Sequence, residues 1–170
     1  MAQSSYLSAV NQKVLFATQL LAAVKTNNSH QTEALVQSVA LQLYQAWHWH
    51  LCDVATIYKL ADPQLVIDAD ALVAMLEAEG KCPAEAVEMQ YLTADSNSWV
   101  SELFNAHAQL SRLPVIRRAE MDADRLPMIA LDAVSAEGLR NIEWTVLAAE
   151  NWLGKLSELI DRQRDMMVEF

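Results

Sequence analysis

"VQSVALQLYQAWHWHLCDVATIY", residues 36–58, places apolar side chains at helical spacing and contains neither glycine nor proline. At about 100° per residue, its main apolar positions fall within one arc of about 100°. They are Val36, Ala40, Leu43, Tyr44, Trp47, Leu51, Val54 and Tyr58. The pattern predicts a long amphipathic helix that begins near the polar break "KTNNSHQTEA" and ends at about Leu60, with Trp47 in the core.

Apolar periodicity predicts further helices on both sides of this one. They cover about residues 4–25, 63–79, a segment opening at Pro83, 99–113, and a last segment from a cap at Ser135 nearly to the C-terminus. Asp62 followed by Pro63 reads as cap and first helical residue, and Gly80 as a stop. Whether residues 84–113 form one kinked helix or two stays open. Residues 114–134 contain two prolines and no helical period, which predicts a long irregular connection.

The composition agrees with an all-helical chain. Ala and Leu supply 49 of the 170 residues, a count made along the sequence, whereas Gly supplies 3 and Pro 4. A chain of this length suits one domain. We therefore expect residues 1–170 to form a single all-α domain, an antiparallel four-helix-type bundle with one or two extra short helices.

The charge narrows the classes of partner. The formal net charge is −10, and the stretch from Asp62 to Ser111 contains nine carboxylates and only one basic residue, Lys81. Nucleic-acid binding needs a basic surface, and anionic membranes repel an acidic one, so neither partner is expected. No apolar run approaches the ~20 residues of a membrane-spanning helix. Two cysteines and no recognisable secretory signal favour a reduced, cytoplasmic protein.

Histidine and cysteine crowd into "QAWHWHLCD", residues 45–53. On a helix His48 and His50 point about 160° apart and cannot share an ion. His48 and Cys52 lie four residues apart, on neighbouring turns, and remain candidate metal ligands. A structural zinc site takes four ligands, so the structural interpretation of the pair is favoured over metal binding.

The sequence contains no coherent catalytic set. No histidine follows a glutamate by three positions, which excludes the usual di-iron bundle motif, and the standard nucleotide-binding and nucleophile motifs are absent. We therefore expect that the protein is not an enzyme and binds no cofactor. His50 and His107 lie beside apolar stripes and are read first as core histidines. The alternative is a small-molecule or metal-binding bundle with an interior pocket formed by Trp47, His50 and His107.

Three large apolar residues fall outside the main stripes. Trp49 projects toward Asp53's side of its helix and needs a second contact surface or exposure. Trp144 and Leu147 project about 150° from the Ile142–Ile160 stripe of the last segment. Tryptophan is enriched at interaction hot spots. The function itself is not readable from the residues, and our best hypothesis is a non-catalytic protein that binds a protein partner or itself.

The opening "VNQKVLFATQLL", the segment "EALVQSVALQLYQAWHWHLCDVATIYKL" and the late "LPMIALD" together resemble an uncharacterised family of small, all-helical gammaproteobacterial proteins, a domain of unknown function. The likeness covers most of the chain. It implies an all-helical fold and a bacterial cytoplasmic protein, and it supplies no activity and no catalytic residue.

Overall fold

The computed structural model describes residues 5–24, 28–112 and 144–167. Within them the chain is helical and contains no strand, which confirms the all-α prediction. The elements are α1 (Tyr6–Ala22), α2 (Ser29–Ile57), the 3₁₀ turn η1 (Pro63–Leu65), α3 (Ala69–Ala78), α4 (Ala84–Ala94), α5 (Trp99–Leu110) and α6 (Val146–Met167). No helix in the described ranges is long and apolar enough to cross a membrane.

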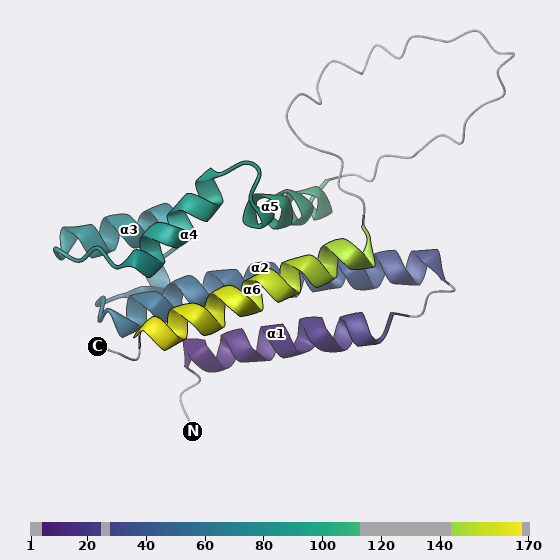
Figure 1. The fold of residues 1–170 in the computed structure, drawn as a ribbon, viewed down its shortest axis with the longest axis horizontal. Helices are drawn as coiled ribbons and strands as arrows, with labels where there is room; N and C mark the ends of the chain where they lie inside the picture. The colour runs from purple at the N-terminus through teal and green to yellow at the C-terminus, as the bar shows by residue number, and fades with distance from the viewer. Residues whose placement is uncertain (1–4, 25–27, 113–143, 168–170) are drawn as a thin grey trace, which may run out of the picture.

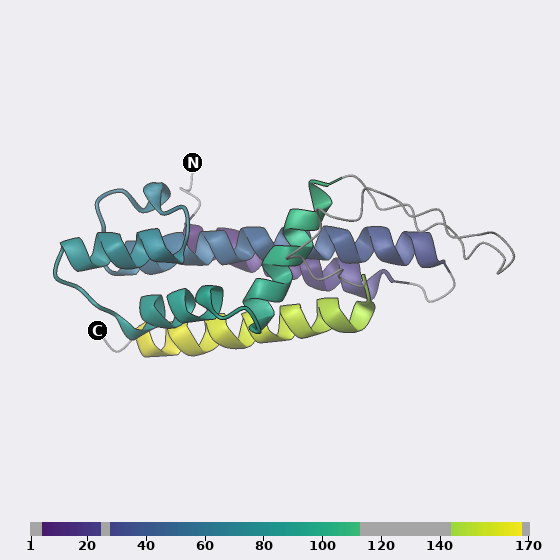
Figure 2. The ribbon, with the colours of Figure 1, turned by 90° about the horizontal axis from the view of Figure 1, so that it is seen from above.

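α2 is the central element, and the other helices pack around it (Figure 1). α1 lies antiparallel to α2 on one side, and α3, α4 and α5 cover the opposite side. α6 lies beside α2 and runs in the same direction, while α5 crosses both helices steeply (Figure 2). The antiparallel four-helix arrangement is therefore not confirmed, because α2 and α6 are parallel.

The core is built chiefly from the predicted apolar stripe of α2. Val36, Leu43, Trp47, Leu51 and Val54 are all buried. Toward the C-terminal end of α2 burial extends beyond that stripe to Cys52, Asp53 and Ala55. Here the Cys52 thiol lies against Val66, directly after η1, and the Asp53 carboxylate accepts a hydrogen bond from the Leu7 backbone of α1. α6 contributes a second stripe to the same core, which consists of Ala149, Trp152, Leu156, Leu159, Ile160, Gln163 and Met167.

The prediction of one helix over residues 63–79 is wrong. Pro63 starts only a 3₁₀ turn, and Val66 then adopts extended backbone with φ −72° and ψ 106°. α3 begins afterwards, where the Asp68 carboxylate accepts a hydrogen bond from the Ala71 N–H at 2.7 Å. Asp62 makes no such side-chain cap. Asp-Pro thus marks a turn, and the second aspartate, six residues later, provides the cap.

The helix boundaries after α3 agree in part with those predicted from glycine and proline. Gly80 has φ +72° and ends the α3 segment, and α4 begins directly after Pro83, both as predicted. The segment after Pro83 forms two helices, α4 and α5, and Ser98 caps the second by accepting a 3.0 Å hydrogen bond from the Ser101 N–H.

The last helix starts later than predicted. Residues 144 and 145 precede the helix, and α6 begins at Val146, so a continuous helix from Ser135 is wrong. The Ser135 cap and the predicted 114–134 connection lie outside the described residues.

Candidate functional site

A groove between α1 and α2 is the candidate binding site. It encloses about 370 Å³ and is partly open to solvent. Its lining consists of Ala9, Gln12 and Lys13 from α1 and Tyr44, Gln45, His48 and Trp49 from α2. Residues 9, 12 and 13 share one side of α1, and residues 44, 45, 48 and 49 share one side of α2, as the helical repeat requires.

Aromatic contacts hold the wall of this groove in place. The Trp49 ring packs on Tyr6 of α1, with ring centroids 5.7 Å apart, and on His48 at 5.3 Å. Trp49 is half-buried by these contacts. α1 is therefore the second contact surface that the sequence required for this tryptophan.

Tyr44 connects the groove to α5. The His107 ring lies parallel to the Tyr44 ring, with centroids 3.7 Å apart and an interplanar angle of 2°. Phe104 meets the same tyrosine edge-on at 5.3 Å. Burial lowers the pKa of His107, which favours the neutral imidazole in this stack.

Lys13 is the one formally charged side chain in the groove lining. Its Nζ lies 6.0 Å from the centroid of the Phe16 ring, at the outer limit of a cation–π contact. Within the described residues no carboxylate forms an ion pair with it. The groove therefore has a net positive lining in an acidic protein.

The two candidate metal ligands lie in different surroundings. His48 lines the groove, whereas Cys52 is fully buried, with its Sγ 4.0 Å from the Val66 carbonyl oxygen. Burial, and secondarily the charge of Asp53, raises the pKa of the Cys52 thiol to about 11, so the thiolate is disfavoured. Across the described ranges no group of three or more His, Cys, Asp or Glu residues could hold a metal ion.

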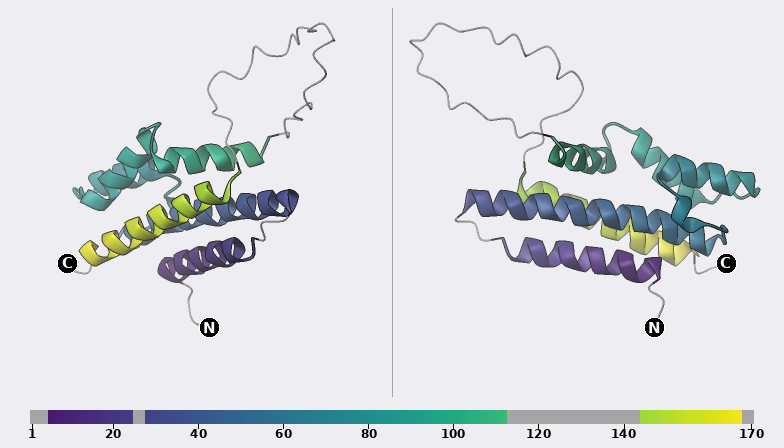
Figure 3. Two further views of the ribbon diagram at one scale, coloured as in Figure 1. Left: turned by 45° about the vertical axis from the view of Figure 1, so that its right-hand side comes forward. Right: turned by 180° about the vertical axis from the view of Figure 1, so that it is seen from behind.

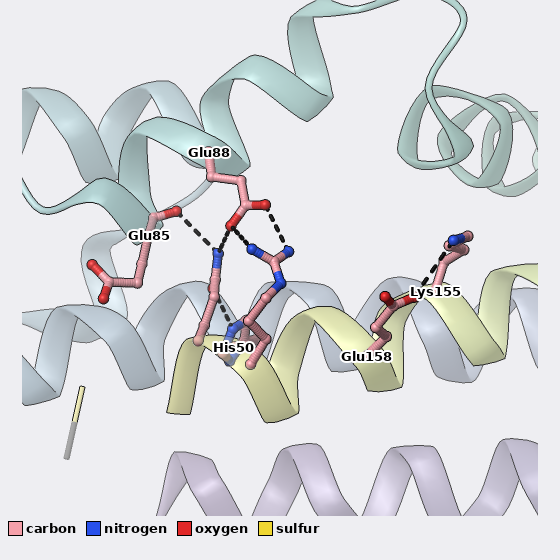
Figure 4. Close-up of polar contacts among 7 residues, drawn as sticks. His50, Glu85, Glu88, Lys155 and Glu158 are labelled. Carbon is pink, nitrogen blue, oxygen red and sulfur yellow. Dashed lines mark hydrogen bonds and ion pairs between the residues drawn. The ribbon is translucent and has the colours of Figure 1, made fainter. Parts of the chain in front are cut away.

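His50 lies in a buried polar network with side chains of α4 and α6 (Figure 4) and is not among the residues that line the groove. Its Nε2 is 2.9 Å from the Gln163 Oε1 of α6. The Gln163 amide nitrogen donates to the Glu85 carbonyl oxygen at 3.3 Å and to the Glu88 carboxylate at 2.9 Å, both of which are acceptors. The amide orientation is thereby fixed, and His50 must carry its proton on Nε2.

The same network joins α2, α4 and α6. Arg162 donates two hydrogen bonds to the Glu88 carboxylate, at 2.7 and 3.2 Å. Burial raises the pKa of Glu88, but the hydrogen bonds from Arg162 and Gln163 outweigh burial and lower it. Burial lowers the pKa of His50 to about 4, so this histidine is neutral at pH 7. Its Nδ1 is buried without a hydrogen-bond partner in the described structure.

Arg164 provides a second set of polar contacts, which joins α6 to α1 and α2. Arg164 of α6 donates to the Asn11 side chain of α1 at 2.8 Å. Its Nη2 also lies 3.7 Å from the Asp53 carboxylate, which is ion-pair rather than hydrogen-bond distance. These contacts position the helix that forms one wall of the groove.

The interior trio predicted from the sequence occupies three settings. Trp47 packs edge-on against Trp99 at 6.0 Å and Phe104 at 5.9 Å. His50 bonds to Gln163, and His107 stacks on Tyr44 at the groove. Among the described contacts none joins His50 to His107.

The two candidate interaction residues near α6 also differ from each other. Trp144 precedes the helix and packs, half-buried, against the core, so the prediction that it projects from a separate face of the last helix is wrong. Leu147 lies in the first turn of α6 and is 76% exposed. Exposure thus supports only Leu147 of this pair as a surface residue.

Sequence reasoning missed Gln163 and Trp152, although a signal was present. Both are fully buried on α6. Gln163 follows Leu156 by seven residues and Trp152 by eleven, so all three share one side of the helix. Extending the apolar stripe through a polar residue would have identified Gln163.

Comparison with known proteins identifies a family without adding a mechanism. No curated protein and no solved structure matches the chain. The model of one family, described as a family of unknown function (DUF6586), matches residues 2–170. The match spans nearly the whole chain, including both helices of the groove, and the protein therefore belongs to this family of unknown function, DUF6586.

Proposed function

We propose that the chain is a non-catalytic protein that self-associates, and that the outer side of α1 is the contact surface between two copies. α1 lies at the edge of the molecule, with one side turned away from the other described helices (Figure 3). Val10 and Ala17 are its only fully buried residues. Leu7, Leu15 and Phe16 remain exposed on it.

The observation that carries the proposal is the distribution of acid. α1 is the only one of the described α-helices that contains neither Asp nor Glu. Two copies that each carry a net charge of −10 repel each other, and burying carboxylates in a shared interface costs further free energy. Contact through α1 avoids that cost, because its exposed side offers Leu, Phe, Ser, Thr, Asn and Gln side chains.

Leu15 is the residue on which to test this surface. It is 52% exposed, lies in the middle of α1 and is not part of the groove lining. Sedimentation equilibrium should show a reversible dimer for the wild type and a monomer for Leu15→Glu. Because the copies repel, the dimer should also tighten as salt screens their charge. Circular dichroism checks that the variant keeps its helices.

The matched control is Leu147→Glu, the same substitution at a leucine of α6 that is more exposed than Leu15, 76% against 52%. It should leave the dimer intact. A wild type that stays monomeric at every concentration would refute self-association. Dissociation by Leu147→Glu together with an unaffected Leu15→Glu variant would assign the interface to the start of α6 instead.

A further inference from the structure

We propose that the α1–α2 groove binds a small aromatic carboxylate. The groove is separate from the proposed self-association surface, because Leu15 is not among its lining residues. The groove volume of about 370 Å³ falls in the range of about 300–1,000 Å³ that is usual for small-molecule sites. Its lining combines apolar and aromatic surface with a few polar groups, as such sites do.

The charge of the lining selects an anion. The Lys13 ammonium is the one formal charge there, and the Gln12 and Gln45 side chains bring amide N–H donors beside it. A cationic ligand would meet Lys13 without a carboxylate in the lining to compensate. A carboxylate would instead give Lys13 the partner that the described residues do not supply.

The two helices that form the groove carry few acidic residues. Lys13 is the only charged residue of α1, and in α2 the acidic residues are Glu33 and Asp53, near the two ends of the helix. Asp53 faces Arg164. At physiological salt the Debye length is about 8 Å, so the acids of more distant exposed surfaces contribute little at the groove.

The body of the ligand follows from the aromatic wall. Tyr44, His48 and Trp49 supply ring surface, and Ala9 leaves room opposite them. Tyr44 is held by its stack on His107, and Trp49 by its contact with Tyr6, so little side-chain freedom is lost when a ligand binds. A flat aromatic ring gains contact with these surfaces, whereas a small hydrophilic anion such as acetate would not.

Three probes of similar size separate charge from shape: benzoate, benzyl alcohol and benzylamine. Binding is followed by NMR through the side-chain amide signals of Gln12 and Gln45, which report on the groove directly. Benzoate should shift both signals and bind about two- to fivefold more tightly than benzyl alcohol, the advantage expected of one partly exposed ion pair. Benzylamine should not shift them. Added salt should weaken benzoate binding only.

Variants test the assigned residues. Lys13→Gln should remove the preference for benzoate over benzyl alcohol, and Lys155→Gln, at an exposed lysine of α6, should not. Gln45→Glu should abolish benzoate binding, and Gln45→Lys should strengthen it. Gln45 and Lys155 are exposed and Lys13 is only half-buried, so these substitutions should leave the fold intact. Titrating the Leu15→Glu variant, expected to be monomeric, separates this result from self-association.

The proposal is overturned if benzoate shifts neither glutamine signal, if benzyl alcohol binds equally well, or if Lys13→Gln binds benzoate like the wild type. Acetate binding with the affinity of benzoate would likewise overturn the aromatic part of the inference.

Discussion

Replacing Gln163 by alanine should lower the free energy of unfolding by about 2–4 kcal/mol. Gln163 is fully buried, accepts a hydrogen bond from His50, and donates to Glu85 and Glu88. The largest contribution is the His50 Nε2–H, which would remain buried without a partner at a cost of about 1–3 kcal/mol. Loss of the two donated bonds and of buried side-chain atoms adds about 1 kcal/mol.

Urea unfolding measures this effect directly. The midpoint should fall while the slope m stays constant, since the substitution changes stability rather than the surface exposed on unfolding. Gln37→Ala is the matched control, because its amide donates only to Glu33 on the exposed side of α2, and it should stay within about 0.5 kcal/mol of the wild type. The series should use one protein concentration, because self-association adds apparent stability.

A double-mutant cycle tests the pairwise part of the reasoning. His50→Leu strands the Gln163 oxygen, and Gln163→Leu strands the His50 N–H, whereas the double variant removes both polar groups. The double variant should therefore cost at least about 1 kcal/mol less than the sum of the single variants. An additive cycle, or a loss below about 1 kcal/mol for Gln163→Ala, would refute the account of a tightly coupled buried network.

Three further predictions follow from local geometry. Asp68→Ala should cost about 1 kcal/mol in urea unfolding, as a lost helix cap does, whereas Asp62→Ala should cost far less because Asp62 does not cap a helix. Gly80→Ala should destabilise the protein by about 1 kcal/mol, because Gly80 has a positive φ. Gly154→Ala, inside α6 with open space around the new Cβ, should stabilise it by about 0.5–1 kcal/mol. Changes in unfolding free energy of the same sign for both variants would contradict this. The folded-state pKa of His50, about 4, lies below its ordinary value of 6.5, so its stabilising contribution is complete above pH 6.5 and is lost as the pH falls toward 4. Urea midpoints should decline through this window, and His50→Phe should flatten the decline. A variant whose midpoints decline as steeply as those of the wild type would argue against His50 as the titrating group.

The sequence predicts the elements that depend on repeated local signals. The apolar stripe of α2 recurs over many turns, so periodicity alone assigns Trp47 and Leu51 to the core, where both are buried. Gly80 and Pro83 likewise mark real boundaries. A single Asp-Pro pair is less informative, since Asp62 and Asp68 both suit a cap, and only the backbone conformation between them selects Asp68.

The candidate site was predicted only in fragments. Trp49 and His48 stood out by composition, but the groove exists because α1 packs antiparallel to α2 and brings Gln12 and Lys13 beside them. The partner of His50 lies 113 residues away, and no local pattern pairs distant polar residues. The direction of α6 relative to α2 depends in the same way on contacts between segments far apart in the chain.

The packing of α6, the last helix of the chain, against α2 sets the order in which the protein can close during synthesis. α1 and α2 are neighbours in the chain and can pair soon after they leave the ribosome, whereas α6 follows more than eighty residues after α2 ends. Until then the place on the core that Trp152 and Leu156 will fill is exposed to water. During that interval chaperones that recognise apolar segments can compete with α6 for the nascent chain.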